Sequence, residues 1–165
     1  MTMNAGRPEG RCTLLGIDLG ERRIGLAIAD ADVLAARPLT TIARARSLAP
    51  ADDAATLARI AQEHAVAELV VGLPLEASGA EGPMAAAAAT WARAVAGRLR
   101  LPVTLRDERL TGYLAESRLG PMPRGRSGGP PSRTQRDRYR ERVDREAAAI
   151  ILQDELDARH ARVSG

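Results

Sequence analysis

Short apolar runs separated by tight turns dominate the N-terminal part of the chain. The runs at residues 13–18, 24–30 and 37–42 each have the length of a strand. Apolar runs of this length, bounded by turn residues, are typical of strands, and short connections between them favour antiparallel pairing. The pattern therefore predicts an antiparallel meander.

Helical and strand patterns alternate in the middle of the chain. Apolar residues recur at helical spacing after a first turn that contains Asp52 and Asp53, where carboxylates interact favourably with the helix dipole. The pattern predicts, in order, a helix over residues 51–64, a strand over 68–74, an alanine-rich helix over 83–99 and a strand over 103–108. Strands that alternate with helices favour parallel pairing, so periodicity alone predicts a three-layer mixed α/β domain.

The last third of the chain combines helical segments with an irregular one. Helices are predicted over residues 110–119 and 142–160, and the residues between them are rich in Gly, Pro, Ser and Arg. A segment of this composition does not pack regularly, and long loops inside a compact domain are usually functional or disordered. We therefore expect a flexible loop at about residues 120–138 within a single domain that spans residues 12–160.

Composition limits how the protein could recognise a partner. The 165-residue chain has a formal net charge of +3 and no Lys, so its side-chain cations are arginines. A positive charge is compatible with a polyanionic partner. Trp91, Tyr113 and Tyr139 are the only aromatic residues, which argues against nucleic-acid binding mainly by base stacking.

The N-terminus and the cysteine content bear on localisation. Cys12 is the single cysteine, which excludes an intramolecular disulfide and fits a reducing cytoplasm. Residues 1–11 lack the apolar core of a secretion signal, and no apolar run reaches the roughly 18 to 20 residues that span a bilayer. We expect a disordered leader over residues 1–11 and a cytoplasmic protein with no membrane partner.

Three acidic residues lie at the edges of predicted apolar elements. Asp18 ends the first strand, Glu108 ends the fifth, and Asp144 begins the last helix. Because Asp is depleted in strand interiors, an acid at a strand end suits either a turn cap or a site that must hold charge. Glu108 could equally pair with a neighbouring Arg, and Asp144 could cap its helix. Taken singly, these residues leave a structural and a metal-binding role open.

The segments around these acids carry a family resemblance when they are taken together. They are residues 14–30, 70–75 followed by 79–83, 103–111 and 142–153. In this order they resemble the YqgF family, also called the RuvX or Holliday-junction-resolvase-like family, over roughly residues 13–156. The resemblance implies an RNase H-like fold, in which a mixed five-stranded sheet carries helices on both faces.

The resemblance also implies a metal-dependent nuclease. Asp18, Glu108 and Asp144 match the catalytic acids of the family and would bind Mg²⁺ or Mn²⁺. Two divalent ions can activate a water and stabilise a leaving oxygen, and carboxylates are preferred ligands of such hard ions. Because like charges repel, these acids should be strained or partly protonated without metal. The weaker candidates are Asp107, Asp30 and Glu146.

Arginines gather in and after the predicted loop. Arg binds phosphate bidentately, and a flexible loop can become ordered on its target, although an ordinary solvated loop is the alternative. We expect these arginines to bind nucleic acid with an affinity that falls steeply with salt. They are Arg124, Arg126, Arg133, Arg136, Arg138, Arg140, Arg142 and Arg145. Within the family motifs, Arg22, Arg23 and Arg109 are further expected phosphate contacts.

The resemblance leaves two classes of nucleic acid as candidate substrates. The resemblance implies trimming of the 5′ end of the 16S ribosomal RNA precursor, or resolution of four-way DNA junctions as the alternative. A junction resolvase generally acts as a dimer, and we expect a monomer or weak homodimer here.

Two other classes of function compete with the nuclease. A non-catalytic nucleic-acid-binding module would need only the arginines. An ATP-binding phosphotransferase would share the Asp18 and Gly20 turn, but that architecture needs two such lobes and this chain has residues for one.

Overall fold

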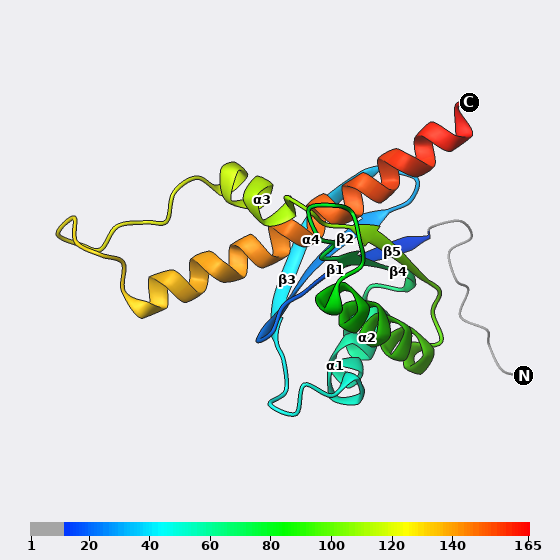
Figure 1. Ribbon diagram of the computed structural model, residues 1–165, viewed down its shortest axis with the longest axis horizontal. Coiled ribbons are helices and arrows are strands. Elements are labelled where there is room, and N and C mark those ends of the chain that lie inside the picture. The colour runs from blue at the N-terminus through cyan, green and yellow to red at the C-terminus, as the bar shows by residue number, and fades with distance from the viewer. Residues whose placement is uncertain (1–11) are drawn as a thin grey trace, which may run out of the picture.

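The computed structural model describes residues 12–165, which form a central sheet of five strands (Figure 1). The predicted leader at residues 1–11 lies outside the described residues. The strands are β1 (Thr13–Leu19), β2 (Arg23–Asp30), β3 (Ala35–Ala43), β4 (Val66–Leu73) and β5 (Val103–Asp107). They lie in the order β3-β2-β1-β4-β5, in which β2 runs antiparallel to its neighbours β1 and β3, and β4 and β5 run parallel to β1.

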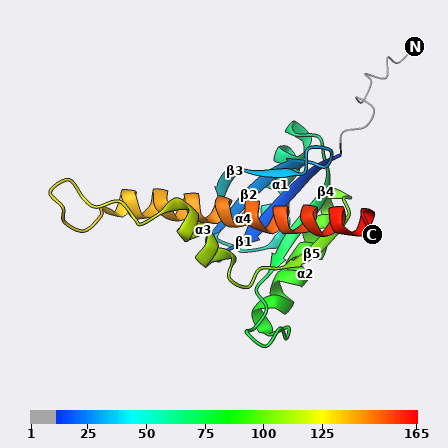
Figure 2. The same cartoon turned by 90° about the horizontal axis from the view of Figure 1, so that it is seen from above.

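Helices cover both faces of this sheet. The helices are α1 (Pro50–Glu63), α2 (Pro83–Leu99), α3 (Thr111–Leu119) and α4 (Arg133–Val163). Helices α1 and α2 pack on one face, and α4 crosses the other (Figure 2). None of the helices within residues 12–165 has both the length and the apolar composition needed to cross a membrane. The strand order and the two helical layers confirm the predicted RNase H-like fold.

Alternate side chains of β1 pack into the cores on the two faces of the sheet. Leu15 and Ile17 belong to the core under α1 and α2, whereas Leu14 belongs to the core under α4. Because successive side chains of a strand point to opposite faces, Gly16 and Asp18 lie on the α4 side with Leu14. The period-2 pattern of β1 therefore aims Asp18 towards α4.

Helix α4 contacts the sheet at positions that lack a side chain. A Cβ atom on Gly16 would lie 2.8 Å from the carbonyl oxygen of Ala148, and one on Gly25 would clash with the carbonyl oxygen of Asp144. The helix itself presents small residues, since Ala148 is fully buried there. This close approach brings the backbone of α4 down onto β1 and β2 at the height of Asp144.

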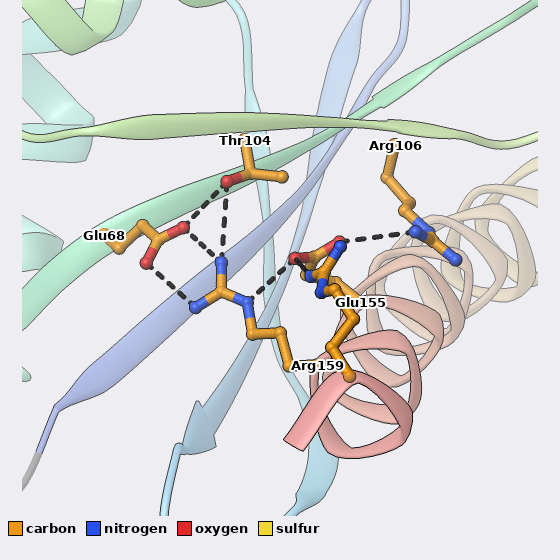
Figure 3. A network of polar contacts seen from close by, with 6 residues as sticks. Glu68, Thr104, Arg106, Glu155 and Arg159 are labelled. Carbon is orange, nitrogen blue, oxygen red and sulfur yellow. Dashed lines mark hydrogen bonds and ion pairs between the residues drawn. The ribbon is translucent and has the colours of Figure 1, made fainter. Parts of the chain in front are cut away.

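A polar network fixes the C-terminal half of α4 to the part of the sheet formed by β4 and β5 (Figure 3). Arg159 donates to Glu68 of β4 at 3.0 Å and to Glu155 at 2.8 Å. Glu155 is buried and also accepts a contact from Arg106 of β5 at 3.4 Å. A buried carboxylate needs such partners, and the network therefore ties α4 to the two parallel strands.

The start of α4 differs from the prediction. The helix begins at Arg133 rather than at residue 142, so the predicted extent of the loop, residues 120–138, is wrong and the irregular segment ends at residue 132. The cause is a capping box, in which Ser132 accepts from the backbone N–H of Gln135 at 3.2 Å and the Gln135 side chain accepts from the Ser132 backbone at 2.8 Å. The first turns lack a continuous apolar stripe, which is why periodicity did not reveal them.

This long helix builds a projection from the domain. Helix α3, residues 120–132 and the N-terminal half of α4 form an arm that extends beyond the sheet (Figure 1). Tyr139 is buried in the arm, and its hydroxyl donates to the carbonyl oxygen of Gly120 at 2.7 Å. The arm is thus held together by its own contacts.

We expect Gly25→Ala to destabilise the protein by about 3 kcal/mol, because the added methyl group meets backbone that cannot move without lifting α4. The matched control is Gly97→Ala in α2, where nothing lies within 4 Å of the added atom. Removing a helical glycine there should stabilise the protein by about 0.5 to 1 kcal/mol. Urea unfolding measures both. Equal effects of the two substitutions would show that α4 does not depend on close contact at Gly25.

Candidate active site

The three predicted catalytic acids lie on the α4 side of the sheet. Asp18, near the end of β1, pairs with Gly25 of β2. Asp144 lies in α4 directly above that glycine, and Glu108 immediately follows β5. Three segments that are distant in sequence therefore bring their acids to one edge of the sheet.

A glycine in β4 makes room for Glu108. The backbone N–H of Glu108 donates to the carbonyl oxygen of Leu73 at 3.0 Å, which continues the pairing of β4 with β5 by one residue. A Cβ atom on Gly72 would clash with Oε2 of Glu108. The carboxyl group of Glu108 thus crosses Gly72 in the direction of Asp18, with which it shares a hydrogen bond.

Asp18 and Glu108 perturb each other electrostatically. Burial, the neighbouring charge of Asp18 and the hydrogen bond with Asp18 together raise the pKa of Glu108 to about 9. Burial likewise raises the pKa of Asp18, against the lowering effect of the hydrogen bond from Glu108, and the charge of Asp144 adds to the rise. The two carboxyl groups therefore retain a proton at a pH where free carboxylates have lost theirs.

The donor set fits a hard divalent cation. Oε2 of Glu108 is buried and has no hydrogen-bond partner among the described residues. An unpaired buried oxygen costs about 1 to 3 kcal/mol. Oxygen ligands are those that Mg²⁺ and Mn²⁺ prefer, so a divalent ion between Asp18 and Glu108 would remove both the repulsion and this cost.

Asp144 is close to this pair but already has a partner. Its Oδ2 accepts from Nε of Arg23 at 2.6 Å. Within residues 12–165, no three His, Cys, Asp or Glu side chains are arranged to hold one metal ion together. Asp18 and Glu108 are therefore in contact, whereas Asp144 lies beside them and is paired with Arg23.

A groove of about 540 Å³ opens beside Asp144. The turn between β1 and β2 forms one wall, and one face of α4 forms the other. The lining residues are Gly20, Glu21, Arg22, Arg23, Asp137, Arg140 and Asp144. Three guanidinium groups line the groove together with three carboxylates, and guanidinium groups bind phosphate bidentately.

Helix α4 carries most of the arginines that were predicted in and after the loop. Asp137, Arg140 and Asp144 line the groove together because residues three and four apart lie on one helix face. Arg140 is therefore the α4 arginine that the structure places in the groove. Arg133, Arg136 and Arg138 lie on α4 rather than in the predicted loop, and Arg140, Arg142 and Arg145 follow them on the same helix.

The remaining predicted cations have other surroundings. Residues 120–132, which contain Arg124 and Arg126, lie at the outer end of the arm (Figure 1). Arg109 donates to Asp107 at 2.7 Å. Arg22 is exposed and lines the groove with Arg23.

The weaker acidic candidates do not join the site. Asp107 binds Arg109, and these hydrogen bonds lower the pKa of Asp107 despite the opposing effect of burial. Asp30 pairs with the first residue of β1, at the opposite end of that strand from Asp18. Glu146 accepts from Arg118 of α3 at 3.1 Å.

Sequence reasoning missed Glu21 and Asp137 as lining residues of the groove. Glu21 directly precedes Arg22 in the expected turn, but nothing in the local sequence shows which wall it faces. Asp137 lies seven residues before Asp144, a spacing that would have placed both on one face had the start of α4 been recognised.

Known proteins are similar to this chain over most of its length. A family model described as "RuvX: Holliday junction resolvase" matches residues 12–158. A protein of Anaeromyxobacter dehalogenans named "Putative pre-16S rRNA nuclease" is 46% identical over 145 residues, which cover 88% of this chain and 96% of the relative. A protein of the same name from Chloroflexus aggregans is 44% identical over 147 residues, which cover 89% of this chain and 94% of the relative.

Among solved structures, the RuvC protein of T. thermophilus in complex with a Holliday junction substrate is similar to this chain. The two are 18% identical, with a TM-score of 0.48, and the match covers 90% of this chain and 96% of RuvC. The family match and the matches to the two bacterial relatives each extend over most of the sequence. The chain therefore belongs to the RuvX family, which its motifs predicted.

Proposed function

We propose that this protein is a metal-dependent endonuclease that processes the 5′ end of the 16S ribosomal RNA precursor. The contact between the half-buried carboxyl groups of Asp18 and Glu108 is the observation that carries the proposal. Two acids are not held together at such a position for stability, because the arrangement raises the pKa of both. Membership of the RuvX family and the names of the relatives support the reaction and the substrate.

Asp18 and Glu108 would hold the first divalent ion, Mg²⁺ or Mn²⁺, and Asp144 would complete the ligand set. When bound, such ions supply an activated water and stabilise the leaving oxygen of a phosphodiester. Glu108 must give up its proton for this purpose. Its Oε2, which accepts no hydrogen bond from the described residues, is then free to face a cation.

The groove would position the phosphate backbone at the acids. Arg22, Arg23 and Arg140 lie around it and can contact consecutive phosphates. The arm, whose sequence contains further arginines, extends away from the sheet (Figure 2). Such contacts favour a substrate with a defined backbone shape over one with a defined base sequence.

A four-way DNA junction is the second candidate substrate. The description of the matching family as a Holliday junction resolvase supports it. Resolution requires cuts in two strands, for which a dimer with two sites is the usual solution. Processing of a ribosomal RNA precursor requires one site, and thus agrees with a monomer or weak homodimer acting in the cytoplasm.

Asp18→Asn should abolish cleavage, with a loss of at least about a hundredfold, because the amide cannot replace a charged metal ligand. The assay follows a labelled precursor 16S RNA fragment and a labelled four-way DNA junction side by side, with Mg²⁺ or Mn²⁺. The matched control is Asp30→Asn at the opposite end of the β1–β2 pair. The preferred substrate identifies the biological role. Unchanged cleavage by Asp18→Asn, or binding without cleavage by the unmodified protein, would contradict the proposed chemistry.

Glu108→Gln should make thermal stability less dependent on pH. The folded protein holds the Glu108 proton up to about pH 9, against about 4.5 for the unconstrained group. Stability of the unmodified protein should therefore fall as pH rises through this window. In EDTA near pH 9 the variant should melt higher, by roughly 2 to 4 °C for each kcal/mol of repulsion removed.

Thermal melts at several pH values in EDTA measure this effect, with Glu116→Gln on the exposed side of α3 as the control. Added Mn²⁺ should raise the melting temperature of the unmodified protein above pH 8 and leave Glu108→Gln nearly unaffected. Parallel pH profiles for the two proteins would mean that Glu108 carries no strained proton.

Arg140→Gln should reduce the salt dependence of nucleic-acid binding. Loss of one phosphate contact lowers the slope of log K against log salt by roughly 0.7 to 0.9. Arg98→Gln, on exposed surface of α2 at the other face of the sheet, removes the same charge and should leave the slope unchanged. Binding titrations in EDTA at several salt concentrations measure both. Identical slopes for the two variants would exclude a phosphate contact at Arg140.

A further inference from the structure

Arg23 joins the groove to the proposed metal ligands. Its Nε lies 2.6 Å from Oδ2 of Asp144, and the two side chains are 27% and 23% exposed. Both side chains also line the groove. The ion pair is therefore open to any anion that enters the groove.

The turn before β2 determines this position. The backbone N–H of Gly20 donates to the carbonyl oxygen of Arg23 at 2.9 Å, which closes the turn and starts the strand at Arg23. Arg23 and Gly25 are two residues apart and so point to the same face. Since Gly25 lies opposite Asp18 and beneath Asp144, the guanidinium emerges on the side of the acids.

A guanidinium has the same hydrogen-bonding geometry for a carboxylate and for a phosphate. Arg23 can therefore exchange Asp144 for a phosphate without a change in its own chemistry. When Arg23 binds a phosphate instead, Asp144 loses its ion pair and can bind another cation. While the pair is intact, Asp144 is not grouped with Asp18 and Glu108 as a ligand set within the described residues.

We propose that Arg23 is a positioning residue that holds Asp144 until a nucleic-acid phosphate in the groove takes over its guanidinium and releases Asp144 to the metal site. This inference rests on the proposed nuclease function. It makes the complete metal site a consequence of substrate binding. By linkage, nucleic acid then raises the affinity for the metal ion by the same factor by which the ion raises the affinity for nucleic acid.

The test is calorimetric titration of the full chain with Ca²⁺, a hard cation with oxygen ligands. Titrations are made without nucleic acid and with a saturating short RNA whose integrity is checked on a gel. Arg23→Gln should bind Ca²⁺ at least about fivefold more tightly than the unmodified protein in the absence of RNA, the lower range of a typical coupling. Its further gain on adding RNA should be smaller than that of the unmodified protein.

Arg22→Gln is the matched control, because it removes the same charge from the same groove. It should leave the Ca²⁺ affinity without RNA within about twofold, since among the described residues it is Arg23, not Arg22, that is paired with Asp144. Arg23→Lys is a second variant that retains the charge but holds a carboxylate less firmly. Its Ca²⁺ affinity without RNA should lie between that of the unmodified protein and that of Arg23→Gln. If Arg23→Gln does not fold, Arg23→Lys takes its place in the comparison.

The outcomes separate this inference from the function on which it rests. Equal Ca²⁺ affinities for Arg23→Gln and Arg22→Gln, with unchanged gain on RNA, would overturn the role of Arg23 and leave the nuclease intact. Failure of the unmodified protein to bind Ca²⁺ with or without RNA would overturn the metal site itself. Tighter binding by Arg23→Gln alone supports the exchange.

Discussion

The close packing of α4 against β1 and β2 is the contact on which the rest of the site depends. Gly16 and Gly25 leave no side chain between the sheet and the helix, so the backbone of α4 meets the strands directly. Antiparallel pairing sets Asp18 opposite Gly25, and the helix then delivers Asp144 above it. A bulkier residue at this contact would separate these acids without altering either of them.

Asp18 and Glu108 are two acidic groups held close together where burial disfavours their charge. Contacts elsewhere in the fold stabilise the elements that carry them. Burial raises the pKa of both Asp18 and Glu108, and the charge of a neighbouring carboxylate adds to each rise, that of Asp144 at Asp18 and that of Asp18 at Glu108. At the other end of α4, Arg159 binds two carboxylates and connects the helix to β4. A site of this kind trades stability for function, as strained active sites commonly do.

Local sequence pattern predicted most of the fold but only part of the site. The strands and the acids follow from apolar runs and motifs, because each of these signals lies within a few neighbouring residues. The early start of α4 was hidden because its first turns are polar and are fixed by the Ser132 cap. The Arg23 and Asp144 contact joins residues 121 positions apart. Only the tertiary packing at Gly25 brings them together, so no local pattern could reveal it.

The central claim is that Asp18 and Glu108 together hold a divalent ion at the edge of the sheet. Anomalous diffraction from crystals of the protein grown with Mn²⁺ above pH 8 tests it most directly. We expect an anomalous peak between these two carboxylates, from an ion bound by Oε2 of Glu108, and no such peak in crystals of Asp18→Asn. Fully occupied Mn²⁺ elsewhere on the protein, with Asp18 and Glu108 still sharing a proton, would contradict it.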